Sequence, residues 1–248
     1  MRGEGKRCLI LGGAADAREL AALLVAQSIH TITSLAGVTA TPLLPVGRVR
    51  IGGFGGVDGI IAFCGDEAIN LIADATHPFA ARISANAHAA AARLGIRYVR
   101  LERPAWQAGP GDRWIDAEDT SAAAAALAPG ARALLTVGRK DLEPFFARSD
   151  VNGIVRSIEP PAPPPPNWQV LQQRPPFTID HELGLMRAHA ITIVVTKNAG
   201  GEQTSAKLMA ARRLEIPVVM IARPAKPDAE VVDNAAGMVR MIAATGTA

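Results

Sequence analysis

The sequence has few cysteines, few aromatic residues and no long apolar run, and each scarcity excludes a class of protein. Its two cysteines, Cys8 and Cys64, lie far apart without a His or Cys at ligand spacing. Neither a disulfide framework nor a metal site is therefore expected. Aromatic residues make up 4% of the chain, too few for a surface that stacks the bases of single-stranded nucleic acid. No apolar run reaches the ~18 residues that a membrane-spanning helix needs.

Charge and the first residues favour a cytoplasmic protein with a small anionic ligand. The net charge is +3 and the pI is about 9.2. This mild excess suits an anionic substrate, but the chain lacks the dense basic stripe of a nucleic-acid binder. The opening segment MRGEGKRCLILGG contains only a short apolar stretch, so no signal peptide is expected. We therefore predict a cytoplasmic location and no contact with nucleic acid or a membrane.

Apolar segments of strand length alternate with alanine-rich helical segments along the chain, which predicts an α/β fold with parallel sheets. The 248 residues fit two domains, and we place the boundary near Pro129-Gly130. The proline-rich segment 159–168 is expected to be an exposed loop between two strands. Strands are expected at 7–11, 30–35, 69–74, 97–101, 133–137, 153–158, 191–196 and 218–221, and helices at 15–26, 57–63, 79–94, 121–128, 142–147, 180–188, 204–214 and 233–244.

The segment CLILGGAADARELAALL, residues 8–24, contains a buried strand, a glycine pair and a helix. Glycine lets the backbone turn sharply and approach a phosphate, and the free N–H groups of the next helix attract an anion. The pattern departs from the G-x-G-x-x-G fingerprint, and a glycine pair after a strand also occurs for close packing alone. Its place at the first strand-to-helix turn favours a dinucleotide phosphate site at Gly12 and Gly13.

The region after the second predicted strand favours NADPH over NADH. Folds that prefer NADH usually place an Asp or Glu there to hold the ribose hydroxyls. No acidic residue occurs between Leu20 and Val57, whereas Arg48 and Arg50 lie in this window. A 2′-phosphate would be tolerated there, although either arginine alone could equally be a solvated surface residue. The segment IGGFGG, residues 51–56, would also let backbone approach a ligand, with a flexible loop as the alternative.

Polar residues follow three further predicted strands, at the sheet edge where ligands bind in α/β folds. In DATHPFAARISANA, residues 74–87, His77 is the best candidate for proton transfer, with helix capping or packing as its alternative. In TVGRK and VTKNAGGEQTSAKL, basic residues cluster near strand ends, where they could bind carboxylates or phosphates. Any one of them could instead be solvated. The residues that this pattern singles out are Thr76, His77, Arg139, Lys197, Thr204 and Lys207.

Together these segments resemble the precorrin-6A reductases, an NADPH-dependent family of cobalamin (vitamin B12) biosynthesis. The resemblance rests on LILGG, SLAG, RIGGFGG, DATHPFA, ERPAW, TVGR, VTKNAGGEQTSAKL and IPVVMIARP, which occur in one order from Leu9 to Pro224. It implies two Rossmann-like lobes with parallel sheets flanked by helices and a cleft between them. Residues 1–130 would bind NADPH, and residues 131–248 would contribute to the site for a carboxylate-rich tetrapyrrole.

The implied oxidoreductase activity is hydride transfer from the nicotinamide to a ring double bond, which converts precorrin-6A to precorrin-6B. Neighbouring pathway enzymes are candidate partners. A cobalt-precorrin-6A reductase and, in another class, a non-catalytic dinucleotide-binding regulator are the alternatives. The family often has an arginine after SLAG where this chain has Val38, which leaves the 2′-phosphate to Arg48, Arg50 or backbone amides. The implied assignments are Gly12, Gly13, Ala14 and Ala15 at the pyrophosphate; Ser34 near the ribose; Gly37 and Gly53 at the cofactor; Thr76 and His77 at the nicotinamide, His77 also as the catalytic candidate; and Arg139, Lys197, Thr204 and Lys207 at substrate carboxylates.

Overall fold

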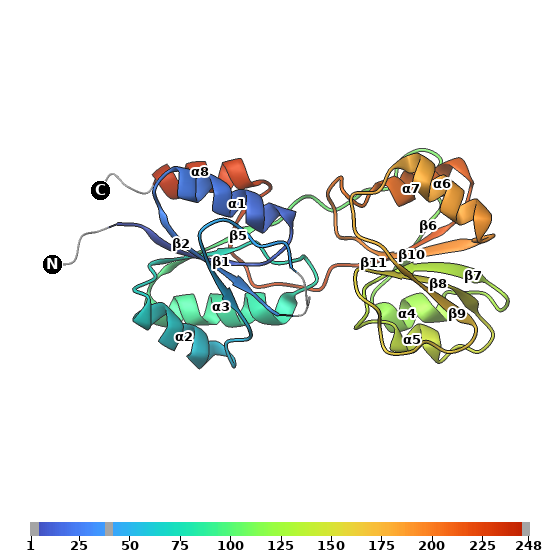
Figure 1. Ribbon diagram of the computed structural model, residues 1–248, viewed down its shortest axis with the longest axis horizontal. Coiled ribbons are helices and arrows are strands. Elements are labelled where there is room, and N and C mark those ends of the chain that lie inside the picture. The colour runs from blue at the N-terminus through green and yellow to red at the C-terminus, as the bar shows by residue number, and fades with distance from the viewer. Residues whose placement is uncertain (1–4, 38–41, 245–248) are drawn as a thin grey trace. The chain divides into compact units, whose positions relative to one another are not determined.

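The computed structural model describes residues 5–37 and 42–244, so Val38 lies outside the described residues. The chain forms two compact units (Figure 1). The first unit consists of Met1–Pro104 with Pro224–Ala248, and the second consists of Ala105–Arg223. Among the described residues, no helix is long and apolar enough to cross a membrane.

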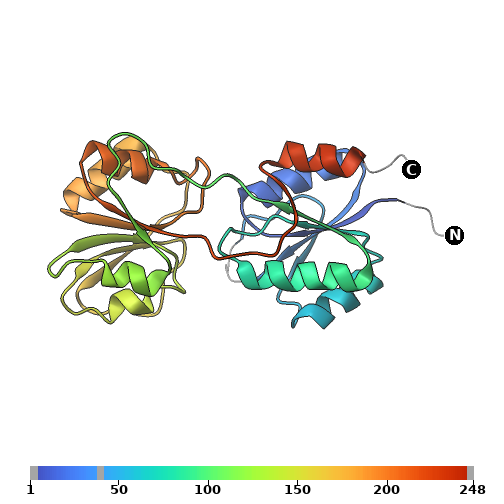
Figure 2. The same ribbon diagram turned by 180° about the vertical axis from the view of Figure 1, so that it is seen from behind.

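The first unit is a parallel sheet covered by helices on both faces. Helices α1 (Ala15–Ala26) and α8 (Ala235–Ala244) cover one face, and α2 (Val57–Asp66) and α3 (Ala81–Leu94) cover the other (Figures 1 and 2). Side chains of a strand alternate between faces, so Cys8 and Ile10 pack with α1 and α8 while Leu9 and Leu11 pack with α2 and α3. The strands are β1 (Arg7–Leu11), β2 (His30–Leu35), β3 (Arg48–Ile51), β4 (Leu71–Asp74), β5 (Arg97–Leu101) and β12 (Glu230–Val232).

The second unit repeats this architecture. Helices α6 (Ile179–Ala188) and α7 (Ala206–Arg213) cover one face of its parallel sheet, and α4 (Thr120–Ala125) and α5 (Glu143–Phe146) cover the other (Figure 1). The strands are β6 (Trp114–Ala117), β7 (Arg132–Thr136), β8 (Asn152–Ser157), β9 (Trp168–Gln172), β10 (Ile193–Lys197) and β11 (Val218–Ile221). The proline-rich segment connects β8 to β9, as the sequence predicts.

Both sheets share the central strand order of a Rossmann fold. The first reads β3-β2-β1-β4-β5-β12, which is the 3-2-1-4-5-6 order. The second reads β9-β8-β7-β10-β11-β6; its strands β7 to β11 follow the 3-2-1-4-5 order, whereas the strand at the sixth position, β6, precedes the other five in the chain. The predicted α/β architecture of two Rossmann-like units is therefore confirmed. All the predicted strands and helices are present, with ends shifted by a few residues.

The predicted boundary at residue 130 is wrong. Strand β6 pairs with β11, so the residues from 105 onward belong to the second unit. Strand β12 pairs with β5, so the chain returns to the first unit after residue 223. Both strands are short and lie at sheet edges, and neither has the apolar run that marks the predicted strands. The other two edge strands, β3 and β9, are also absent from the prediction.

A group of buried charged side chains lies between α6, α7 and the sheet of the second unit. Arg156 Nη1 donates to Glu182 Oε1 at 2.5 Å, and both side chains are buried. Lys207 is only 3% exposed; its Nζ donates to the Thr204 carbonyl at 2.7 Å and lies 4.7 Å from the centre of the Trp106 ring. The pKa of Lys207 is lowered to about 7, chiefly by burial and also by the charge of Arg156, while the charge of Glu182 acts in the opposite direction.

The buried ammonium predicts that stability rises with pH above neutrality. Between a folded pKa of about 7 and the ordinary value of 10.5, the unfolded chain holds a proton on Lys207 that the folded chain lacks. The free energy of unfolding then gains up to about 1.4 kcal/mol per pH unit. Lys207→Met should abolish this gain, measured by urea denaturation from pH 7 to about 8.5, where unfolded thiols begin to titrate. Equal slopes for the two proteins would contradict the prediction.

A close approach between β7 and β8 makes a second prediction. Gly153 of β8 has a φ of 152°, and a Cβ there would lie 2.0 Å from the Ala133 carbonyl oxygen of β7. Gly153→Ala should therefore lower the free energy of unfolding by at least about 1–3 kcal/mol. The chain's three tryptophans, Trp106, Trp114 and Trp168, all lie in the second unit, so their fluorescence during urea denaturation reports on it.

Gly184→Ala is the matched control for this substitution. Gly184 lies within α6, is exposed, and a Cβ there would meet no atom within 4 Å among the described residues. Because alanine favours a helix over glycine, this variant should gain about 0.5–1 kcal/mol. A Gly153→Ala protein as stable as the wild type would contradict the close approach of Gly153 to the Ala133 carbonyl.

Candidate functional site

The candidate site of the first unit lies where its strand order reverses. Ligands of open α/β sheets bind outside the carboxyl ends of the strands at this point, which here falls between β1 and β4. The turn after β1 is tied to both neighbours: Gly12 N donates to the Ser34 carbonyl at 3.1 Å, and Ala75 N donates to the Leu11 carbonyl at 2.9 Å. Gly12, Ser34 and Thr76 are thereby brought to one edge.

Packing accounts for Gly12, whereas the helix start after it remains open to an anion. Gly12 has a φ of 134°, and a Cβ would lie 2.3 Å from the Ala75 carbonyl oxygen. A Cβ at Gly13 would lie 2.9 Å from Leu35 Cδ2. Helix α1 begins after Ala14, which supplies no side-chain cap. The first N–H groups of a helix need outside acceptors, so the backbone of Ala14 and Ala15 suits a phosphate.

Asp16 places a carboxylate in the first turn of α1, which would repel an anion. Arg103 Nη1 donates to Asp16 Oδ2 at 2.5 Å, and Arg18 Nη1 donates to the Gly13 carbonyl at 2.9 Å. The two guanidinium groups offset the negative charge at this turn. This pairing leaves no signal in the sequence, because Arg103 follows β5, far along the chain from Asp16.

A buried carboxylate shapes the turn that carries Thr76 and His77. Asp74 is fully buried; its Oδ1 accepts from Thr76 N at 3.0 Å and its Oδ2 from the Tyr98 hydroxyl at 2.6 Å. Burial and the Asp74 charge raise the pKa of Tyr98, so the phenol stays protonated as the donor. His77 is exposed, and its Nδ1 accepts from Phe79 N at 3.3 Å. This geometry leaves His77 accessible for contact with a ligand.

The two arginines that the sequence singles out have different positions. Arg48 donates to both carboxylate oxygens of Glu67, at 2.5 and 2.7 Å, and it pairs in register with Ile32 near the start of β2. Arg50 pairs in register with Ser34, and its Nη1 donates to Ser34 Oγ at 3.2 Å. Arg50 therefore lies at the carboxyl edge of the sheet, and Arg48 does not.

The glycine-rich segment after β3 combines turns with open space. Gly37 has a φ of 72° and packs against Ile51, whose Cγ2 would lie 3.3 Å from a Cβ. Gly52 and Gly55 also have positive φ angles, of 122° and 79°. At Gly52, Gly53 and Gly55, a Cβ would meet no described atom within 4 Å. Gly53 differs from Gly52 and Gly55 because its φ is not positive. Neither backbone conformation nor local packing therefore requires a glycine there, whereas a ligand close to the backbone would require one.

The corresponding edge of the second unit carries paired charges. The strand order reverses between β7 and β10. Lys197 ends β10, and its Nζ donates to Asp141 Oδ2 at 2.5 Å. Arg139 is exposed in the turn after β7 and lies 3.1 Å from Glu159 Oε2. Asp141 is not among the residues that the sequence singles out, because its contact with Lys197 depends on the ends of β7 and β10 lying side by side.

The structure does not support the substrate role expected for Lys207. Its ammonium is buried and is already bonded to the Thr204 carbonyl, because the start of α7 turns this side chain towards the core. Thr204 is half-buried. The neighbouring loop is fixed through Trp106, whose backbone exchanges two hydrogen bonds with the Asn198 amide at 2.8 and 3.0 Å. Lys197 and Arg139 therefore remain as the charged candidates for binding carboxylates, and the role of Thr204 stays a prediction.

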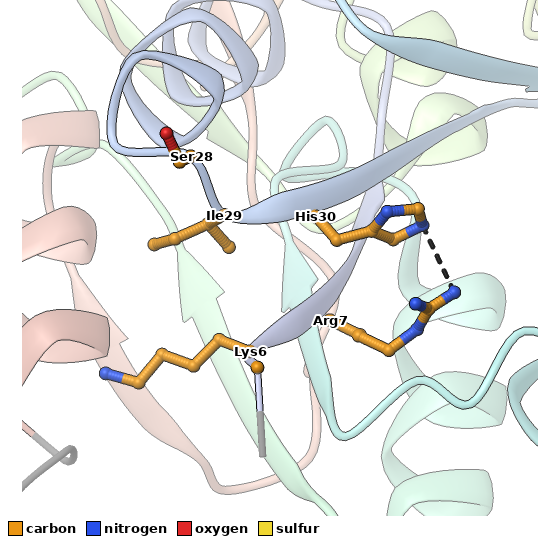
Figure 3. Close-up of a pocket in the computed structure, with 6 residues that line it drawn as sticks. Lys6, Arg7, Ser28, Ile29 and His30 are labelled. Carbon is orange, nitrogen blue, oxygen red and sulfur yellow. Dashed lines mark hydrogen bonds between the residues drawn. The ribbon is translucent and has the colours of Figure 1, made fainter. Parts of the chain in front are cut away.

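A basic pocket lies at the opposite, amino end of β1 and β2 (Figure 3). Its cationic groups have structural partners: Lys6 Nζ donates to the Ile242 and Ala243 carbonyls at the end of α8, and Arg7 Nε donates to the Glu67 carbonyl at 2.8 Å. We assign no ligand to this pocket. Across residues 5–37 and 42–244, no group of three or more His, Cys, Asp and Glu side chains is arranged to hold a metal ion.

Comparison with known proteins agrees with these features. The family described as "Precorrin-6x reductase CbiJ/CobK" matches residues 7–243. Precorrin-6A reductase of Rhodococcus erythropolis is 47% identical over 240 residues, 95% of this chain and 97% of that protein. Cobalt-precorrin-6A reductase of Priestia megaterium is 32% identical over 238 residues, 87% of this chain and 90% of that protein. The solved structure "CobK precorrin-6A reductase" is 41% identical, covers 98% of each chain and has a TM-score of 0.93. This chain therefore belongs to the precorrin-6x reductase family CbiJ/CobK.

Proposed function

We propose that this protein is an NADPH-dependent precorrin-6A reductase that forms precorrin-6B in cobalamin biosynthesis. The observation that carries the proposal is the uncapped start of α1 at the strand-order reversal of the first unit, in a chain that belongs to a reductase family. No acidic residue lies between Leu20 and Val57, which favours NADPH over NADH. A reductase of a carboxylate-rich substrate also has a use for Lys197 and Arg139 at the edge of the second unit, which a dinucleotide-binding regulator does not need.

The metal-free substrate is favoured over its cobalt-containing counterpart. The relative named precorrin-6A reductase shares 47% of its residues with this chain over 240 positions, against 32% over 238 positions for the relative named cobalt-precorrin-6A reductase. Both alignments cover most of the chain. The difference in identity is therefore not an effect of alignment length.

The first unit would bind the cofactor and orient its reactive ring. When bound, NADPH supplies a hydride, and one proton completes the reduction of a C=C bond of the macrocycle to CH–CH. The N–H groups at Ala14 and Ala15 would hold the pyrophosphate. Ser34 would lie near the ribose, and Thr76, fixed by Asp74, would contact the nicotinamide. His77 is exposed, and we propose it as the first candidate for the proton donor.

The second unit would bind carboxylates of the tetrapyrrole through Lys197 and Arg139. Lys197 is held in place by Asp141 at 2.5 Å, so its ammonium loses little additional side-chain entropy when a substrate carboxylate arrives. Arg139 is exposed and offers a fork of N–H donors that matches a carboxylate. We do not include Lys207 in this set, because its side chain is buried.

An assay with defined substrates tests the proposed activity. We expect NADPH absorbance to fall, and the pigment spectrum to change, when the protein is mixed with precorrin-6A. NADH should support a slower reaction at equal concentration. Turnover of cobalt-precorrin-6A alone would move the assignment to the cobalt-containing substrate. If a control reductase consumes NADPH and this protein does not, the enzymatic proposal is wrong.

Lys197→Ala should weaken substrate binding without weakening cofactor binding. Loss of a charge-assisted hydrogen bond costs about 1.5–3 kcal/mol, so the KM for precorrin-6A should rise roughly 10- to 100-fold while the KM for NADPH stays constant. Lys140→Ala is the control, because it removes an exposed positive charge from the turn after β7. A selective rise in the KM for NADPH would place Lys197 at the cofactor instead.

A further inference from the structure

The carboxyl ends of β1, β2 and β3 form a continuous edge on which Arg50 has a defined place. Gly12 N donates to the Ser34 carbonyl at 3.1 Å, which joins the turn after β1 to the end of β2. Ser34 pairs in register with Arg50 of β3, and Arg50 Nη1 donates to Ser34 Oγ at 3.2 Å. In dinucleotide-binding folds the end of the second strand faces the adenosine ribose. The Arg50 guanidinium thus lies beside the expected position of the ribose 2′ substituent.

The guanidinium of Arg50 is held rigidly by neutral groups. Besides Ser34, its Nη1 donates to the Gly52 carbonyl at 2.6 Å, and its Nη2 donates to the Gly53 carbonyl at 2.7 Å. Its carbon Cζ lies 3.8 Å from the centre of the Phe54 ring. These contacts use three of the five N–H groups that a guanidinium offers. The fork is therefore oriented before any ligand arrives, and it keeps donor capacity.

No carboxylate within the described residues neutralises Arg50, in contrast to Arg48 on the same strand. Arg48 donates to both oxygens of Glu67, whereas the described acceptors of Arg50 are a hydroxyl and two carbonyls. Arg50 is half-buried, and burial lowers its pKa. A partly desolvated positive charge without a counter-ion is costly, and an anionic ligand would remove that cost.

The backbone that holds Arg50 is also accessible. At Gly52 and Gly53, whose carbonyls accept from the guanidinium, an added Cβ would meet no described atom within 4 Å. Ligand atoms can therefore approach the backbone at these two glycines without displacing a described side chain. Open space, an oriented fork of donors and a positive charge without a carboxylate partner among the described residues occur together here.

We propose that Arg50 binds the 2′-phosphate of NADPH and determines the preference of this protein for NADPH over NADH. The proposal rests on the proposed cofactor site at the start of α1, and it excludes Arg48, the other arginine of β3. The distinguishing chemistry is a phosphate monoester on the adenosine ribose, which a guanidinium fork binds through two parallel N–H···O bonds.

Binding measurements without turnover test this assignment. Isothermal titration calorimetry would compare adenosine 2′,5′-bisphosphate with adenosine 5′-monophosphate, and NADP⁺ with NAD⁺, on the wild type, Arg50→Gln and Arg48→Gln. Arg50→Gln should weaken the two ligands that carry a 2′-phosphate roughly 10- to 100-fold and leave the other two unchanged. Arg48→Gln removes the same charge from the same strand and should change no affinity.

The outcomes separate this inference from the proposed function. Wild-type affinity of Arg50→Gln for adenosine 2′,5′-bisphosphate overturns the assignment to Arg50 and leaves the cofactor site standing. Equal weakening of all four ligands in a folded Arg50→Gln protein assigns Arg50 to loop structure alone and also overturns it. Failure of the wild type to bind NADP⁺ or NAD⁺ overturns the cofactor site itself.

Arg50→Lys provides a second test if Arg50→Gln fails to fold. It keeps the charge but loses the planar fork. It should bind adenosine 2′,5′-bisphosphate more weakly than the wild type, with unchanged affinity for adenosine 5′-monophosphate. Wild-type affinity of Arg50→Lys for both nucleotides would overturn the role of the fork.

Discussion

Parallel pairing of β1 with β2 on one side and β4 on the other is the constraint on which the candidate cofactor site depends. It brings the turn after β1 so close to the turn after β4 that a Cβ at Gly12 would lie 2.3 Å from the Ala75 carbonyl oxygen. A glycine is therefore required at position 12 because the two turns are in contact there. The same contact fixes where Thr76 stands relative to the open start of α1. Packing and binding are thus two consequences of one strand arrangement.

Much of this arrangement could be predicted from local patterns. Apolar runs that end in glycine or polar residues mark β1, β2, β4, β5, β7, β10 and β11, and the carboxyl ends of parallel strands meet at one edge. Gly12, Ser34 and Thr76 could therefore be placed together before their contacts were known. The pattern also predicts Lys197 at a strand end, because a polar residue follows an apolar run there.

Other features depend on contacts between distant segments, which no local pattern contains. The four edge strands are β3, β6, β9 and β12, and only pairing with β2, β11, β8 and β5 reveals them. The burial of Lys207 depends on Trp106 and on the carbonyl of Thr204, which helical spacing does not predict. Arg48 and Arg50 are indistinguishable in the sequence. They differ only in the folded chain, where Glu67, just after α2, forms an ion pair with Arg48 and not with Arg50.

The sixth strand of the first sheet has a consequence for synthesis on the ribosome. The second unit is one continuous stretch of chain, residues 105–223. The first unit is not, because the outer edge of β5 is paired only after residues 230–232 have been synthesised. The later half of the chain can therefore complete its fold before the earlier half does. Until then an unpaired edge of a parallel sheet is exposed to other nascent chains. If translation stops before residue 230, the chain lacks β12. The first unit then stays incomplete, although most of it is synthesised first.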